Sequence, residues 1–188
     1  MKFLTSLSGS RGFVVAGLVA ALMGGRAAAQ TASAQLSINL TVQSSISLVF
    51  NDNPSVGTPG FCPLGNAGTS NVTLDLGSAS FTGGATTCGN YIRRAGPATY
   101  EVNSAFDVVV SKSNSSSPNY RLAAQLSAPP PAGVVWLLDT VTLSTAFAPL
   151  DAADSYAQAI TKTLRVQVKN NVPAQVLQET ITFLATAN

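Results

Sequence analysis

The stretch QLSINLTVQSSISLVF, residues 35–50, carries the most regular pattern in the chain. Its apolar residues lie at even positions, with Val49 as the exception, and most residues between them are Ser, Thr, Asn or Gln. Because successive side chains of a β-strand point to opposite faces, this period of two predicts extended structure with one apolar face. The stretch is either the first strand of the protein's own sheet or a strand that pairs with another molecule. Its apolar positions are Leu36, Ile38, Leu40, Val42, Ile46, Leu48 and Phe50.

The same period recurs along the rest of the chain. Segments with alternating apolar residues are separated by connections rich in Gly, Pro, Asn and Ser, which are turn-forming residues. This pattern predicts an all-β fold, an antiparallel immunoglobulin-like β-sandwich of about seven or eight strands with an N-terminal extension. Trp136, inside the apolar run VVWLL, is expected in the core rather than in a sugar-stacking site. The alternating segments are 72–76, 100–110, 120–126, 141–147, 164–168 and 181–185.

One segment, LDAADSYAQA at residues 150–159, favours a short helix of one or two turns. Asp151 is placed to cap it, and Asp154 falls in its first turn. The same two carboxylates are alternatively candidate calcium ligands together with backbone carbonyls.

The N-terminal segment is typical of a secretory signal peptide. A basic region with Lys2 and Arg11 precedes the apolar run GFVVAGLVAALMGG, and small residues allow cleavage after Ala29 or after Ala34. We therefore expect a signal peptide over 1–29, an N-terminal extension over 30–43 and a single β-sandwich domain over 44–188. The expected location is outside the cytoplasm, from the periplasm to the cell surface.

The charge composition argues against nucleic-acid binding. The chain has ten basic and eight acidic residues, and three of the basic residues, Lys2, Arg11 and Arg26, lie within the expected signal peptide. Seven basic and eight acidic residues then remain, whereas a nucleic-acid footprint needs clustered Lys and Arg. We expect no nucleic-acid partner.

Two cysteines, Cys62 and Cys88, are predicted to form a disulfide, because an exported chain meets an oxidising compartment. The chain contains no histidine, which removes the Ser-His-Asp and Cys-His arrangements and the usual near-neutral base. The carboxylates are scattered, with no spacing that favours a catalytic pair. We expect no enzymatic activity, no cofactor and no bound metal.

The two ends of the chain resemble secreted subunits of the spore coat protein U type and the related pilins of archaic chaperone–usher systems. AQLSINLTVQSSISLVFND follows the signal segment, and TKTLRVQVKNNVPAQVLQETITFLATAN closes the chain with a Val-Pro-Ala turn and a Thr-rich alternating strand. Those families commonly carry a cysteine at the start of the first body strand, where this chain has Ser44 and Ser45.

The resemblance implies a non-catalytic, pilin-like structural subunit whose sandwich lacks its final strand. The N-terminal extension of the next subunit fills the gap by strand addition, after a periplasmic chaperone has capped it and an outer-membrane usher has received it. The partners are then identical or related subunits, and the donor residues are Leu36, Ile38, Leu40 and Val42. The alternative is a self-contained cell-surface sandwich for adhesion or glycan binding, in which residues 35–50 are the first strand. The sequence leaves open whether this strand acts in cis or in trans.

Overall fold

The structure is a computed structural model that describes residues 35, 37–56, 60–80, 88, 92–96 (backbone) and 98–188. The expected signal peptide and Leu36 lie outside the described residues. Contacts divide the chain into two units, Met1–Leu40 and Thr41–Asn188, and the strands found in the described residues lie in the second unit. In the described part there are eleven strands and no helix, which confirms the predicted all-β class. Three of these strands, β2, β3 and β8, have only two residues each.

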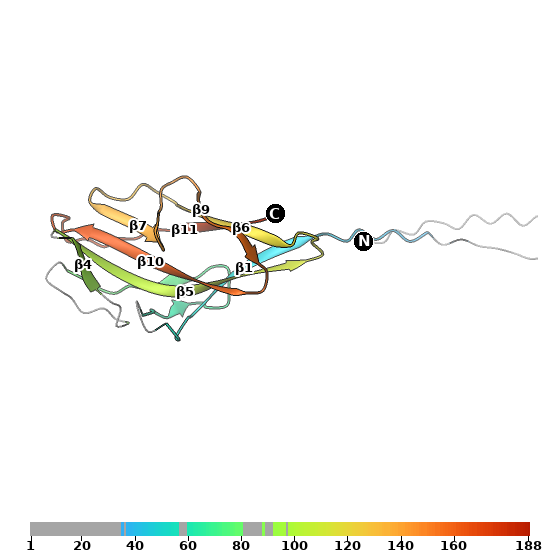
Figure 1. The fold of residues 1–188 in the computed structure, drawn as a ribbon, viewed down its shortest axis with the longest axis horizontal. Helices are drawn as coiled ribbons and strands as arrows, with labels where there is room; N and C mark the ends of the chain where they lie inside the picture. Colours follow the sequence, from blue (N-terminus) through green and yellow to red (C-terminus); the bar gives the residue numbers. More distant parts are fainter. Residues whose placement is uncertain (1–34, 36, 57–59, 81–87, 89–91, 97) are drawn as a thin grey trace, which may run out of the picture. The chain divides into compact units, whose positions relative to one another are not determined.

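The strands form two antiparallel sheets that pack face to face as a sandwich (Figure 1). The first sheet has the order β1-β5-β10-β7-β8, and β4 pairs with the N-terminal part of β5. The second sheet has the order β11-β6-β9, and β2 pairs with β3 in a separate ribbon. The bounds are β1 Ser45–Asn51, β2 Leu64–Gly65, β3 Thr73–Leu74, β4 Ile92–Gly96, β5 Thr99–Ser113, β6 Asn119–Leu126, β7 Val134–Leu138, β8 Val141–Thr142, β9 Ala148–Ser155, β10 Ala159–Lys169 and β11 Ile181–Ala187.

The core lies between the sheets and follows the alternation of the sequence. Even-numbered residues of β5, β6 and β10 face inward, and their apolar members in the middle of each strand are buried. Trp136 belongs to the same cluster, as expected. The predicted inward phase is therefore confirmed for the long strands. The buried set includes Val102, Phe106, Val108, Val110, Tyr120, Leu122, Ala124, Leu126, Leu164, Val166 and Val168.

The prediction of a short helix over 150–159 is wrong. Residues 148–155 form strand β9, which pairs with β6 through two register shifts. Leu122 is paired with Asp151, and Tyr120 with Asp154. The segment pairs with β6 at five of its eight residues, so sheet pairing overrides a weak local helix preference.

The alternating segment 141–147 also behaves differently from the prediction. Only Val141 and Thr142 are in a strand, and the chain then crosses between the sheets. The amide of Leu143 donates to the carbonyl of Trp136 in the first sheet, and the carbonyl of Ser144 accepts from the amide of Leu126 in the second. This crossing closes one lateral side of the sandwich and leaves Phe147 44% exposed. The predicted strand at 72–76 is likewise reduced to Thr73–Leu74.

The predicted disulfide between Cys62 and Cys88 is confirmed, with 4.9 Å between the Cα atoms. Cys62 is buried, and its amide donates to Ser104 Oγ at 2.7 Å. The bridge therefore ties the long connection between β1 and β4 onto β5 in the first sheet.

Replacing Cys88 with Ser is expected to lower the free energy of unfolding by about 3 kcal/mol, because the bridge closes a loop whose ends are 26 residues apart. Urea denaturation of the oxidised protein and the variant measures this difference. The double variant Cys62→Ser/Cys88→Ser is the matched control and should unfold at the same urea concentration as the single variant. An unchanged midpoint in the single variant would show that the bridge does not stabilise the fold.

Candidate assembly surface

The segment that precedes β1 belongs to no strand. Residues 37–44 are without regular structure, and β1 begins at Ser45. Ile38, Leu40 and Val42 are 80%, 84% and 64% exposed, among the most exposed large apolar side chains in the described residues. The fourth residue of the predicted stripe, Leu36, lies outside the described residues.

Ile38, Leu40 and Val42 thus form a regular apolar stripe that is exposed to solvent. Ser37, Asn39 and Thr41 alternate with the three aliphatic residues, so an extended backbone presents the aliphatic side chains on one face. Burying each of them would contribute about 1.5–3 kcal/mol before the cost of ordering the segment. A strand-like stripe of this kind is typical of a segment that acquires its partner on binding.

The two strands at one lateral side of the sandwich, β1 and β11, have free edges. One edge of β1 pairs with β5, and one edge of β11 pairs with β6. In the part of the chain that the structure describes, the only pairing at the other edge of either strand is the bridge between Phe50 and Thr69. The rings of Phe50 in β1 and Phe183 in β11 are 5.0 Å apart, which places the two edges on the same side. Unpaired amides and carbonyls along such edges are a template for a further strand.

The apolar interior is incompletely covered at this side. The inward-facing residues of the central strands are fully buried, for example Val108, Val110 and Leu122 at 0% exposure. Those of the two edge strands are only half-buried except for Phe50, which is 7% exposed, and the opposite side of the sandwich is closed by the crossing at Leu143. An added strand between β1 and β11 would therefore cover apolar surface as well as pair with the backbone. The half-buried set is Ile46, Leu48, Ile181, Phe183 and Ala185.

A charged cluster holds β5 and β10 together on the outer face of the first sheet. Glu101 is 1% exposed and accepts hydrogen bonds from Arg165 at 2.7 Å, Gln167 at 2.9 Å and Asn103 at 3.2 Å. Burial alone would raise the pKa of Glu101, but the hydrogen bonds and the charge of Arg165 outweigh it and lower the pKa to about 2. The cluster stabilises the strand pair that supports β1.

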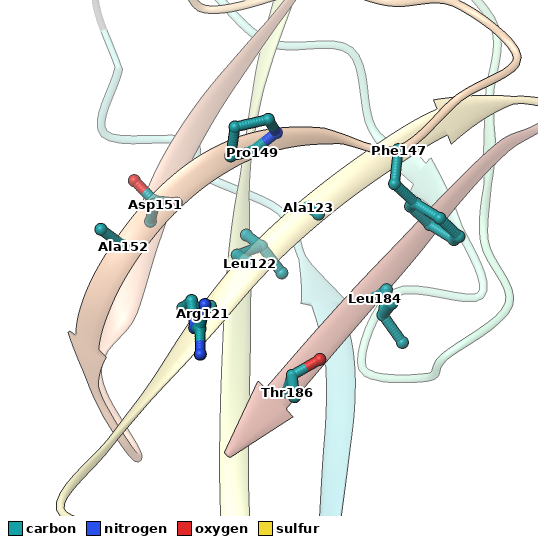
Figure 2. A pocket seen from close by; sticks show the side chains of 9 residues that line it. All are labelled: Arg121, Leu122, Ala123, Phe147, Pro149, Asp151, Ala152, Leu184 and Thr186. Carbon is teal, nitrogen blue, oxygen red and sulfur yellow. The ribbon is translucent and has the colours of Figure 1, made fainter. Parts of the chain in front are cut away.

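A second surface feature is a shallow depression of about 550 Å³ on the outer face of the second sheet (Figure 2). Figure 2 shows the side chains of Phe147 and Leu184 among the lining residues, and they are 44% and 45% exposed. Strands β6, β9 and β11 supply the other lining residues, which are Arg121, Leu122, Ala123, Pro149, Asp151, Ala152 and Thr186.

Among the described residues, Asp151 and Asp154 do not belong to a cluster of metal ligands. No group of three or more His, Cys, Asp or Glu side chains that could hold a metal occurs among the described residues. Asp151 instead forms an ion pair with Lys162, at 2.8 Å between Nζ and Oδ2. Lys162 was not predicted as a site residue. The sequence carries a signal for it, because Lys162 is in the same even-numbered phase as the core residues Leu164 and Val166.

Comparison with known proteins identifies no relative: no protein-family model, curated protein or solved structure matches the chain. In the described residues no helix is long and apolar enough to cross a membrane. The function is therefore inferred from the residues and their geometry.

Proposed function

We propose that the protein is a non-catalytic, pilin-like structural subunit that assembles outside the cell by strand addition. Residues 35–43 of one copy act as the donor strand for the side of another copy that lies between β1 and β11. The single observation that carries this proposal is the exposed stripe of Ile38, Leu40 and Val42, outside any strand and directly before β1.

The free edges of β1 and β11 support the proposal by offering the backbone groups that a donor strand needs. Main-chain hydrogen bonds would fix the direction of the added strand, and the aliphatic side chains would pack against half-buried residues such as Leu48 and Phe183. A slip of one residue would turn the stripe toward solvent, so the alternation also sets the register. A periplasmic chaperone that covers this side before assembly, and an outer-membrane usher, are the partners that such a mechanism requires.

Electron microscopy of cell-surface material, with the protein identified by mass spectrometry in whatever filaments are found, tests the proposal. We expect filaments or ordered polymers that contain this chain as a repeating subunit. A protein that is exported, folded and strictly monomeric at the surface would overturn the proposal.

The second candidate function is a self-contained surface sandwich for adhesion or glycan binding. The observation that favours it is the depression beside Phe147, because a half-exposed aromatic ring in the same depression as the polar side chains of Arg121 and Thr186 suits a sugar ring. A monomeric surface protein that binds immobilised glycans, and loses that binding in Phe147→Ala, would support this alternative.

A further inference from the structure

Lys162 occupies a core-facing position of β10 and is only 4% exposed. It is in phase with Leu164 and Val166, and it is paired across the strands with Phe106, which is also buried. A lysine ammonium at such a position is costly unless it is paired, because burial disfavours the charged form. Its nearest charged partners are Asp151, at 2.8 Å and 2.9 Å to the two carboxylate oxygens, and Asp139 at 3.2 Å.

The register shifts of β9 bring a second carboxyl group to the same place. Asp151 lies opposite Leu122 and Asp154 opposite Tyr120, and these two residues of β6 are 0% exposed. Oδ2 of Asp154 is buried and has no hydrogen-bond partner among the described residues. Burial, then the charge of Asp151, raises the pKa of Asp154, and the charge of Lys162 opposes this rise. Asp154 is therefore a second carboxyl group near Asp151 whose charged form is less favoured than in an ordinary aspartate.

The contact between Lys162 and Asp151 places Nζ close to both oxygens of one carboxylate. Oδ1 accepts a hydrogen bond from Nζ at 2.9 Å, whereas Oδ2 lies 2.8 Å from the same nitrogen outside hydrogen-bonding geometry. A nitrogen this close to both oxygens of a carboxylate also lies near the carbon between them. Reacting atoms stand about 3–3.5 Å apart in near-attack conformers.

We propose that Lys162 and Asp151 condense to form an intramolecular isopeptide bond, with Asp154 relaying the protons. Nζ gives up one proton to a carboxylate and attacks Cγ of Asp151. A bond forms between Nζ and Cγ, one C–O bond of the carboxyl group breaks, and the released oxygen leaves as water with two protons from the original ammonium group. An ammonium and a carboxylate thus become a neutral amide and one water molecule, and no oxidant, reductant or co-reactant is needed.

The condensation would remove a buried ion pair. Keeping two ions out of water is costly even when they are paired, and the neutral amide removes both charges from the interior. Asp139 is the less suitable acceptor, because its side chain is 40% exposed against 20% for Asp151, and its Oδ1 already accepts a hydrogen bond from the amide of Thr163. The bond would join β10 of the first sheet to β9 of the second and so cross-link the two layers of the sandwich. The proposal does not depend on the assembly mechanism proposed above.

Mass spectrometry of the purified full protein tests the bond directly. We expect an intact mass lower by one water molecule than the sequence requires after the disulfide is taken into account. Trypsin should then fail to cleave after Lys162, since its amine is acylated, and should release a peptide of residues 122–165 that lacks one water. A full mass with cleavage after Lys162 would show an ion pair only and would overturn the proposal.

Variants distinguish the bond from other losses of water, such as cyclisation of an aspartate on its own backbone. Lys162→Arg keeps the charge but removes the primary amine, and it should restore the full mass, as should Asp151→Ala. The Asp154→Asn variant keeps both Lys162 and Asp151, but a larger share of it should remain at the full mass. Its circular dichroism spectrum should be unchanged. Asp139→Asn is the matched control and should still lose water. Loss of water that persists in Lys162→Arg would contradict the proposed linkage.

Discussion

Replacing Leu40 with Asp is expected to abolish assembly while the sandwich stays folded. Leu40 is 84% exposed and belongs to no strand, so the change removes no contact from the core of residues 41–188. In the assembled state the same position would be buried, where an unpaired carboxylate is strongly disfavoured. The lost burial of Leu40 alone is worth about 1.5–3 kcal/mol, which corresponds to a loss of roughly ten- to a hundredfold in affinity, and the buried charge adds to it.

Light scattering after size-exclusion chromatography measures the assembly, and circular dichroism measures the fold. Thr41→Asp is the matched control, because it adds the same charge one residue later, on the opposite face of an extended strand. It should assemble far better than Leu40→Asp. Equal assembly by both variants and the unaltered protein would show that the stripe is not buried on assembly.

Acidification from about pH 5 to pH 2 is expected to lower the free energy of unfolding, with a contribution from Glu101 on the order of 3 kcal/mol. The pKa of Glu101 is about 2 in the folded protein and 4.5 in its ordinary state. The unfolded chain therefore binds the proton at a higher pH, so the stabilisation is complete above the ordinary pKa and is lost as the pH falls toward the folded value. Asp154, whose pKa is raised, acts in the opposite direction.

Chemical denaturation at a series of pH values, on the unaltered protein and on Glu101→Gln, isolates this contribution. At neutral pH the variant should be less stable by about 3 kcal/mol, because Arg165 loses a partner that is almost completely buried. Its stability should depend less on pH between 5 and 2. Parallel pH profiles for the two proteins would show that the ionisation of Glu101 does not contribute.

The sequence was sufficient to predict the core residues of the long strands and the disulfide. An alternation with a period of two shows which residues of a strand share a face. It predicted that Tyr120, Leu122 and Leu164 face inward, and these residues are buried. The cysteine pairing followed from there being two cysteines in a chain expected to be exported.

The sequence was not sufficient where an element depends on its partner strand. The register shifts in β9 exist only because the segment pairs with β6, and nothing within LDAADSYAQA encodes them. The ion pair of Lys162 with Asp151 joins two strands that belong to different sheets, so local pattern cannot reveal it. The free edges of β1 and β11 likewise follow from the order of strands in the sheets.

The most direct test of strand addition is calorimetric titration of a variant lacking residues 30–43 with a synthetic peptide of sequence QLSINLTVQ, residues 35–43. We predict saturable binding with one peptide per chain and a higher melting temperature of the complex. A peptide with Asp in place of Leu40 should bind far more weakly. A stable monomeric variant with no affinity for the peptide would contradict the existence of an acceptor side between β1 and β11.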